Sequence, residues 1–265
     1  MIQIFGVIWL EDVKILNPGQ RLRQLRKELQ VKQEELAGDK FSKNYISMFE
    51  NNRRDINAIN ASYLAQKINE IARQKGKDIQ IHASYLLKNE KDIAKDKCEE
   101  WLYEVESNLE ITNYEANVNL HNTILISTDY NLLHFKGRAL FLKGITSFNN
   151  NRYICAITQF LDSLIYFAKE NDYHAMKDVY KNIGITLLKQ KQLGQAIIYF
   201  NLCDSVIRLN LNENIDYDNE VTYYKALCYF KLGQYKIAKK IIECSGSNDS
   251  KLIELNNEIH RSLAM

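Results

Sequence analysis

The sequence of 265 residues predicts an all-α protein, and three observations support this fold class. Proline occurs once and glycine ten times, so turn residues are too sparse for a β-rich architecture. Apolar residues recur at helical spacing, and Leu22, Leu25 and Leu29 form the first such stripe. Hydrophobic residues make up 46% of the chain, a composition typical of folded proteins.

Four helices are expected between residues 14 and 75. Asn17 is a favourable N-cap and Pro18 a favourable first residue, so the first helix should run from residue 18 to about residue 29. Its cations, among them Arg21 and Arg26, are expected mostly outside the apolar stripe. The second helix should cover about 32–37 and the third about 43–51, after a turn at 38–40 and a capping Ser42. The fourth is expected near 58–74, after a left-handed chain reversal at 51–52.

Positive charge is concentrated in this N-terminal part. Residues 14–54 hold 10 Lys and Arg against 5 Asp and Glu, whereas the chain after residue 75 holds 22 against 24. A basic module on a mildly acidic body is typical of a small DNA-binding domain with a separate partner domain. The third expected helix also exposes short polar side chains beside cations, which suits contacts with base edges and phosphates.

Residues 33–37 (Gln-Glu-Glu-Leu-Ala), 42–50 (Ser-Lys-Asn-Tyr-Ile-Ser-Met-Phe-Glu) and 55–56 (Asp-Ile) resemble the Xre/Cro-type helix-turn-helix. In particular they resemble the variant in Rgg- and PlcR-type (RNPP) peptide-pheromone receptors, over about 60 residues. The resemblance implies a lambda-repressor-like domain whose third helix enters the major groove. The DNA-binding positions that it implies are Gln33, Ser42, Lys43, Asn44, Tyr45, Ser47, Met48, Asn51 and Arg53, with Gln33, Asn51 and Arg53 as phosphate contacts.

The chain departs from that pattern at three positions. Met48 replaces the usual arginine, Asn52 a glycine and Phe41 a small turn residue, so base preference at Met48 becomes apolar. The resemblance also pairs Arg26 with Glu50, and we assign that pair to structure rather than to DNA contact. The alternative for the whole module is a small four-helix domain with a solvated basic face.

The C-terminal part contains a repeat. Ala116, Ala156, Ala196 and Ala238 are separated by 40, 40 and 42 residues. Small residues precede three of these alanines by twelve positions (Gly144, Gly184, Ala226), and large ones follow by four (Phe160, Phe200, Ile242). Small residues at this spacing let antiparallel helices approach closely, as in tetratricopeptide repeats. The first repeat is degenerate, anchored by Trp101 and Leu120, and residues 251–263 are expected to form a capping helix.

Stacked helix pairs form a superhelix with a concave groove lined by the first helix of each pair. The candidate peptide-binding residues in this groove are Arg138, Phe141, Asn149, Lys181, Asn182, Ile185, Tyr223, Tyr224 and Leu227, and Trp101, Ile145, Lys189 and Lys231 also face it. Amide and cationic groups suit the backbone and carboxylate of an extended peptide. The resemblance implies that Asn182 binds the pheromone backbone; its alternative role is to close hydrogen bonds between neighbouring helices.

Nothing in the sequence indicates catalysis. It lacks GxGxxG, GxxxxGK[ST], HExxH and GxSxG, its five histidines are scattered, and its five cysteines form no CxxC pair. We therefore expect no enzyme activity, no cofactor and no metal. The widely spaced cysteines fit a reducing cytoplasm, and no apolar run is long enough to span a membrane.

We expect an N-terminal extension (1–13), a helix-turn-helix DNA-binding domain (14–75), a linker helix (76–90) and a tetratricopeptide-like repeat domain (91–265). Translation is expected to start near residue 13. The resemblance implies a cytoplasmic homodimeric transcription regulator that binds a near-palindromic operator and senses a short signalling peptide, as in quorum sensing. Two alternatives stay open: an adaptor whose groove binds a protein partner, and a dimeric regulator without a ligand.

Overall fold

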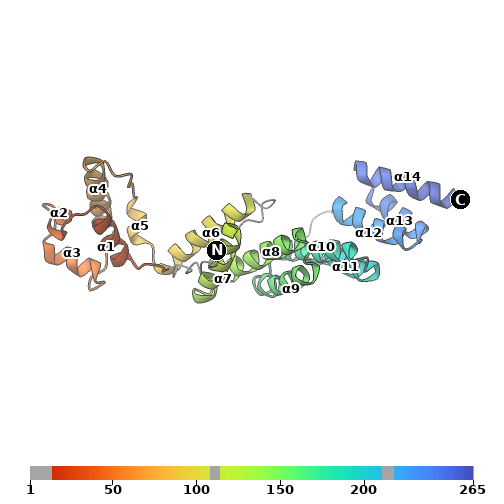
Figure 1. The fold of residues 1–265 in the computed structure, drawn as a ribbon, viewed down its shortest axis with the longest axis horizontal. Coiled ribbons are helices and arrows are strands. Elements are labelled where there is room, and N and C mark those ends of the chain that lie inside the picture. The colour runs from red at the N-terminus through yellow and green to blue at the C-terminus, as the bar shows by residue number, and fades with distance from the viewer. Residues whose placement is uncertain (1–13, 108–113, 211–217, 265) are drawn as a thin grey trace, which may run out of the picture. The chain divides into compact units, whose positions relative to one another are not determined.

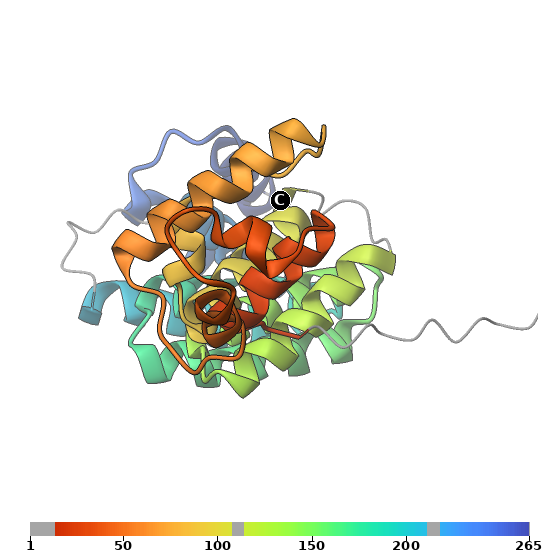
Figure 2. The ribbon, with the colours of Figure 1, turned by 90° about the vertical axis from the view of Figure 1, so that its left-hand side faces the viewer.

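The computed structural model describes residues 14–107, 114–210 and 218–264 of the chain. These residues form fourteen α-helices and no strand, which confirms the all-α fold class (Figure 1; seen from its left-hand side in Figure 2). The chain divides into two compact units, residues 1–97 and 98–265. The N-terminal extension expected at residues 1–13 lies outside the described residues.

The first unit contains α1 (Pro18–Glu28), α2 (Gln33–Ala37), α3 (Lys43–Glu50), α4 (Ala58–Gln74) and α5 (Ala83–Leu87), and α6 (Glu90–Ser107) begins in it. The start of α1 is as predicted. The Asn17 side chain accepts a hydrogen bond from the Gln20 N–H at 2.9 Å, and the Gln20 side chain accepts one from the Asn17 N–H at 3.1 Å. This reciprocal capping, with Pro18 at the first helical position, fixes where the helix begins.

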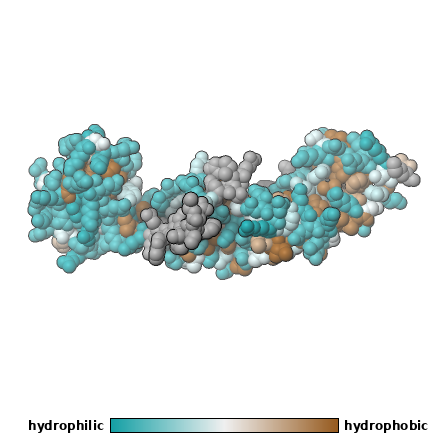
Figure 3. Space-filling view, viewed as in Figure 1, coloured by the Kyte–Doolittle hydropathy of each residue, from teal (hydrophilic) through white to brown (hydrophobic). Residues whose placement is uncertain are grey.

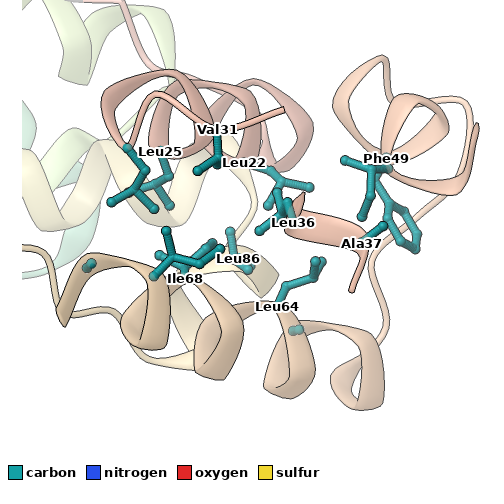
Figure 4. Close-up of a cluster of buried hydrophobic side chains, with 14 residues drawn as sticks. Leu22, Leu25, Val31, Leu36, Ala37, Phe49, Leu64, Ile68 and Leu86 are labelled. Atoms are coloured by element: carbon teal, nitrogen blue, oxygen red, sulfur yellow. The ribbon is translucent and has the colours of Figure 1, made fainter. Parts of the chain in front are cut away.

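One hydrophobic core holds the first unit together (Figure 4). Leu22 of α1, Leu36 of α2, Phe49 of α3 and Leu64 of α4 are all completely buried in it. Leu86 of α5 is also completely buried there, although α5 lies in the segment expected to be a linker helix. The fifth helix is thus part of the packing of this unit.

Arg21 is buried inside the first unit, which corrects the expectation that it lies outside the apolar stripe. Its guanidinium donates to the Leu16 carbonyl oxygen at 2.6 Å and to the carbonyl oxygen of Lys88, just after α5. It also lies 5.3 Å from the centre of the Tyr85 ring. Burial lowers the pKa of Arg21. The cation is enclosed because the chain after α5 returns to α1, which local helical spacing does not reveal.

The second unit contains the rest of α6, then α7 (Tyr114–Asp129), α8 (Leu133–Asn149), α9 (Tyr153–Glu170), α10 (Tyr173–Lys189), α11 (Leu193–Asn210), α12 (Asn219–Lys231), α13 (Tyr235–Ser245) and α14 (Ser250–Ala264). Consecutive helices pack in pairs, α8 with α9, α10 with α11 and α12 with α13. The expected capping helix corresponds to α14, which packs on α12 and α13. In the degenerate first repeat Leu120 is buried as expected, whereas Trp101 is only half-buried and the neighbouring Leu102 enters the core.

Glycine and phenylalanine bring the paired helices together. A Cβ atom on Gly144 would lie 2.5 Å from the Phe160 ring, and one on Gly184 would lie 2.5 Å from the Phe200 ring. The repeated large residue therefore fills the space that the glycine of its own helix pair leaves open. Alanines 156, 196 and 238 of the repeat are completely buried, so the predicted repeat corresponds to the packing unit.

A left-handed residue marks the successive turns from α7 to α11 and the turn between α12 and α13. Asn131, Asn151, Asn171, Lys191 and Gly233 all have positive φ, and each lies two residues before the next helix. Asparagine and glycine tolerate this conformation at low cost, and lysine does so less well. Asn151, Lys191 and Gly233 follow one another at the repeat steps of 40 and 42 residues, and Asn131 and Asn171 are also 40 residues apart, which keeps the helix pairs in register.

The surface differs in character between the parts of the chain. Figure 3 shows hydrophilic residues over most of the visible face of the first unit, whereas hydrophobic residues gather at the surface over α12, α13 and α14. In the part of the chain that the structure describes, no helix combines the length and the apolar character needed to cross a membrane.

Candidate functional site

Helix α3 has one buried face and one exposed face. Ile46 and Phe49 are completely buried against the core, whereas Lys43, Asn44 and Met48 are exposed to solvent. Ser42 precedes the helix as its N-cap, and its side chain accepts from the Tyr45 N–H at 3.4 Å. The helix therefore offers the predicted polar face to solvent.

A buried ion pair fixes the inner side of α3. Arg26 Nε lies 2.5 Å from Glu50 Oε1, and a second guanidinium nitrogen donates to Glu50 Oε2 at 3.0 Å, which confirms the expected pairing. The hydrogen bond from Arg26 to Glu50 raises the pKa of Arg26 against the opposing effect of burial. Gln33, a predicted phosphate contact, donates its side-chain amide to Glu50 Oε2 at 2.9 Å. Arg26, Gln33 and Glu50 thus join α1, α2 and α3.

The outer side chains of α3 make only weak contacts with the protein. Lys43 Nζ lies 3.1 Å from a carboxylate oxygen of Glu34, and both side chains are 59% exposed. Such surface pairs contribute at most about 1 kcal/mol, so Lys43 can exchange this partner for another anion. The Asn51 side chain donates to the Ser47 carbonyl oxygen at 2.8 Å, one turn earlier on the helix.

Tyr45 lies differently from the other predicted base-facing residues. It is half-buried, stacked on Phe41 with ring centres 5.8 Å apart, and packed edge-on against Phe49. The guanidinium of Arg54 lies 4.4 Å from the centre of the Tyr45 ring. Arg54 is one of the two arginines that follow this helix in the sequence, where flanking cations suit contacts with phosphates. Tyr45 therefore holds a cation against the exposed end of α3.

Cations lie at both ends of the exposed face of α3. Lys40 precedes the helix, and its ammonium group lies 5.0 Å from the centre of the Tyr63 ring. Arg53 and Arg54 follow the helix and are both exposed. The left-handed reversal expected at residues 51–52 occurs at Asn52 alone, with φ of 52°, and turns the chain so that the two arginines follow immediately.

A cavity of about 680 Å³ lies in the second unit between α10, α12 and α14. Four predicted peptide-binding residues line it: Ile185 of α10 and Tyr223, Tyr224 and Leu227 of α12. The Tyr224 ring is stacked on Phe200, with ring centres 6.2 Å apart and planes 9° apart. Burial raises the pKa of Tyr224, so its hydroxyl is a neutral hydrogen-bonding group at physiological pH.

The other predicted peptide-binding residues do not line this cavity. Arg138 donates to Glu99 at 3.0 and 3.1 Å and to Glu106 at 2.9 and 3.1 Å, so carboxylates of α6 already occupy its guanidinium. Lys181 donates to Glu220 at 3.0 Å. Phe141 packs against Phe160 with ring centres 5.6 Å apart, and Asn149 is exposed at the end of α8.

Asn182 is half-buried on α10 and bonded within its own helix. Its side-chain nitrogen donates to the Asp178 carbonyl oxygen at 2.8 Å, one turn earlier. Among the described residues its side chain makes no hydrogen bond to a neighbouring helix. No contact therefore supports the alternative role, in which Asn182 closes hydrogen bonds between neighbouring helices. The described residues also contain no group of three or more His, Cys, Asp or Glu able to hold a metal ion.

The sequence of this chain matches no protein-family model and no curated protein. Its structure is similar to that of Bacillus thuringiensis PlcR in complex with the peptide PapR7 and DNA, with 13% sequence identity, a TM-score of 0.43 and coverage of 94% of this chain and 88% of PlcR. It is also similar to the structure of the Y153C mutant of PrgX, with 17% identity, a TM-score of 0.23 and coverage of 94% and 93%.

Proposed function

We propose that this protein is a DNA-binding transcription regulator of the cytoplasm, and that α3 reads base edges in the major groove. The observation that carries the proposal is the division of α3 into a buried face of Ile46 and Phe49 and an exposed face that includes Lys43 and Asn44. Lysine pairs with guanine and asparagine with adenine in the major groove. A helix held firmly on one side can present such groups at a fixed spacing.

The flanking cations provide the phosphate contacts in this proposal. Arg53 and Arg54 are exposed directly after α3, and Lys40 directly before it. Phosphate contacts supply affinity without sequence preference. Each one makes the fall of log affinity with log salt concentration steeper by about 0.9. Tyr45 would act by holding Arg54 in place rather than by touching a base.

We further propose that a short peptide binds in the cavity between α10, α12 and α14. Its volume of about 680 Å³ lies within the range of about 300–1,000 Å³ typical of ligand sites. Tyr223 and Leu227 offer apolar contact area, while Lys189 and Lys231 offer cations for a carboxylate. Peptides with an apolar side chain next to an acidic group or a free C-terminus fit this lining best.

The proposed regulator acts as a homodimer on a near-palindromic operator, with half-sites about 34 Å or a multiple apart. A peptide changes DNA binding only if it binds one arrangement of the dimer better than another, and a coupling of about 1–3 kcal/mol is typical.

The DNA-binding part is tested by selecting binding sites for the full chain from a random duplex library. We expect one enriched motif for the natural chain and none for the double variant Lys43→Ala and Asn44→Ala. Lys77→Ala is the matched control, because it removes an exposed cation outside α3. An unchanged motif in the double variant would exclude α3 as the reading helix.

The proposal that a peptide binds in this cavity is tested by selecting, from a displayed library of random heptapeptides, those that bind the full chain. We expect enriched peptides whose binding weakens in Tyr223→Ala and in Leu227→Ala, which both change the lining of the cavity, but not in Asn201→Ala, an exposed control on α11. Peptide binding that is unaffected by both groove variants would contradict the proposed cavity. If only folded proteins bind, the adaptor alternative holds.

A further inference from the structure

A second cavity, of about 450 Å³, lies between α11, α12 and α13. We infer that it binds a small amphipathic anion, a carboxylate carried on an aliphatic chain. It is separate from the proposed peptide cavity. On α12, Lys225 lines this cavity, whereas Tyr223 and Leu227 line the other. Residues two positions apart on an α-helix are turned by about 200°, so the two cavities use opposite faces of α12.

Positive charge is in excess around this cavity. Lys225 is bound to Asp204 at 2.6 Å, with both side chains about four-fifths buried (18% and 22% exposed). Arg208, Lys236 and Lys240 also line the cavity, and none of the three has a carboxylate partner among the residues that the structure describes. With no carboxylate partner among the described residues, these three cations leave an excess of positive charge around one small space. A bound anion offsets this excess of positive charge, at a site where Lys225 and Asp204 are themselves mostly buried.

The wall formed by α13 is apolar between these cations. Ile237 lies 47% exposed, although α13 packs against its neighbours through Ala238 and Ile242. Ile237, Ile241 and Cys244 are four and seven residues apart, so they share one face of α13, and all three line the cavity. An aliphatic chain over this stripe would remove apolar surface from water, which an inorganic anion cannot do. The cavity volume is within the range typical of small-molecule sites.

The exposed thiol of Cys244 provides a direct probe of occupancy, because it lines the cavity. Cys155 on α9 is also exposed and lies outside the cavity, so it is an internal control in the same molecule. Alkylation of the full chain by iodoacetamide is followed at each cysteine by mass spectrometry, with octanoate, octanamide or inorganic phosphate present. We expect octanoate to slow the reaction of Cys244 at least tenfold in a saturable manner, without change at Cys155. Octanamide and phosphate should have little effect.

Variants test which groups bind the probe. Lys236→Gln with Lys240→Gln should weaken octanoate protection at least tenfold, because both lysines are exposed cavity cations. Ile237→Ser should weaken it through the apolar wall. The matched control, Lys189→Gln with Lys231→Gln, removes the same charge from the peptide cavity and should leave protection unchanged.

Several outcomes would overturn the inference. One is that octanoate gives Cys244 no saturable protection, and another is that it protects Cys155 equally. The others are that octanamide protects Cys244 as well as octanoate does, and that both cavity variants leave the protection by octanoate unchanged. Protection by phosphate as strong as by octanoate would show a site for anions alone. None of these results depends on whether the protein binds DNA or a peptide.

Discussion

The side-chain oxygen of Asn52 accepts a hydrogen bond from the backbone N–H of Gly19 at 3.1 Å, and so joins the end of α3 to the start of α1. The first N–H groups of a helix have no partner within it, and Asn52 supplies one. A Cβ atom on Gly19 would lie 2.2 Å from the Phe49 carbonyl oxygen, so the two helix ends touch through backbone. This contact sets the position of α3 against the first helix.

Gly19→Ala should destabilise the first unit by about 1–3 kcal/mol, because the added methyl group collides with backbone that cannot move aside. Hydrogen exchange measures the change, at the α1 amides for Gly19→Ala and at the α11 amides for the control. Gly194→Ala is the matched control: no atom lies within 4 Å of a Cβ built there, and it is in the first turn of α11. Alanine at that position should stabilise α11 by about 0.5–1 kcal/mol. Equal effects of the two substitutions would contradict the close contact at Gly19.

Arg26→Met should destabilise the first unit by about 3–5 kcal/mol, because it leaves the Glu50 carboxylate, only 2% exposed, without its cation. The double variant Arg26→Met with Glu50→Gln should recover much of this loss, since a neutral amide costs less to bury. Urea unfolding of the single and double variants measures the coupling. Additive losses would show that the two side chains do not interact.

Lys191→Asn should stabilise the second unit by up to about 1 kcal/mol, because Lys191 has a φ of 62° that asparagine tolerates better. Asn171→Lys, at the equivalent turn one helix earlier with φ of 55°, should destabilise by a similar amount. Thermal unfolding compares the two. A gain from Lys191→Gln as large as that from Lys191→Asn would instead show a general effect of surface charge, because both substitutions remove one cation.

Burial raises the pKa of the Cys98 and Cys203 thiols to about 12 and that of Cys228 to about 11. These thiols stay protonated and enclosed near pH 8, so iodoacetamide should modify only the exposed Cys155 and Cys244 in the folded protein, and all five cysteines in urea.

The same shifts make stability dependent on pH. The three buried thiols ionise at lower pH in the unfolded chain than in the folded one. Their contribution to stability is therefore complete below the unfolded pKa of about 8.5 and declines as the pH rises towards 12. Urea midpoints at pH 8 and pH 10 measure this decline, and serine at Cys203 should reduce it. A rising midpoint between these pH values would contradict the burial of the thiols.

The sequence by itself determined those helices that are fixed by interactions between residues close together in the chain. Asn17 and Pro18 fix the start of α1, and α4 spans the predicted residues 58–74. The spacing of small and large residues in the repeat predicted the helix pairs, and Gly144 and Phe160 meet where α8 packs against α9. Caps and helical spacing act within a few residues, which is why a single sequence was sufficient for them.

The tertiary structure alone decided which distant groups meet. Arg21 is buried because it bonds to Lys88, 67 residues away, and Asn52 bonds to Gly19, 33 residues away. No local pattern encodes these contacts, since each depends on how whole helices pack. The same holds for the cations around the second cavity, where Arg208, Lys225 and Lys240 come from three different helices.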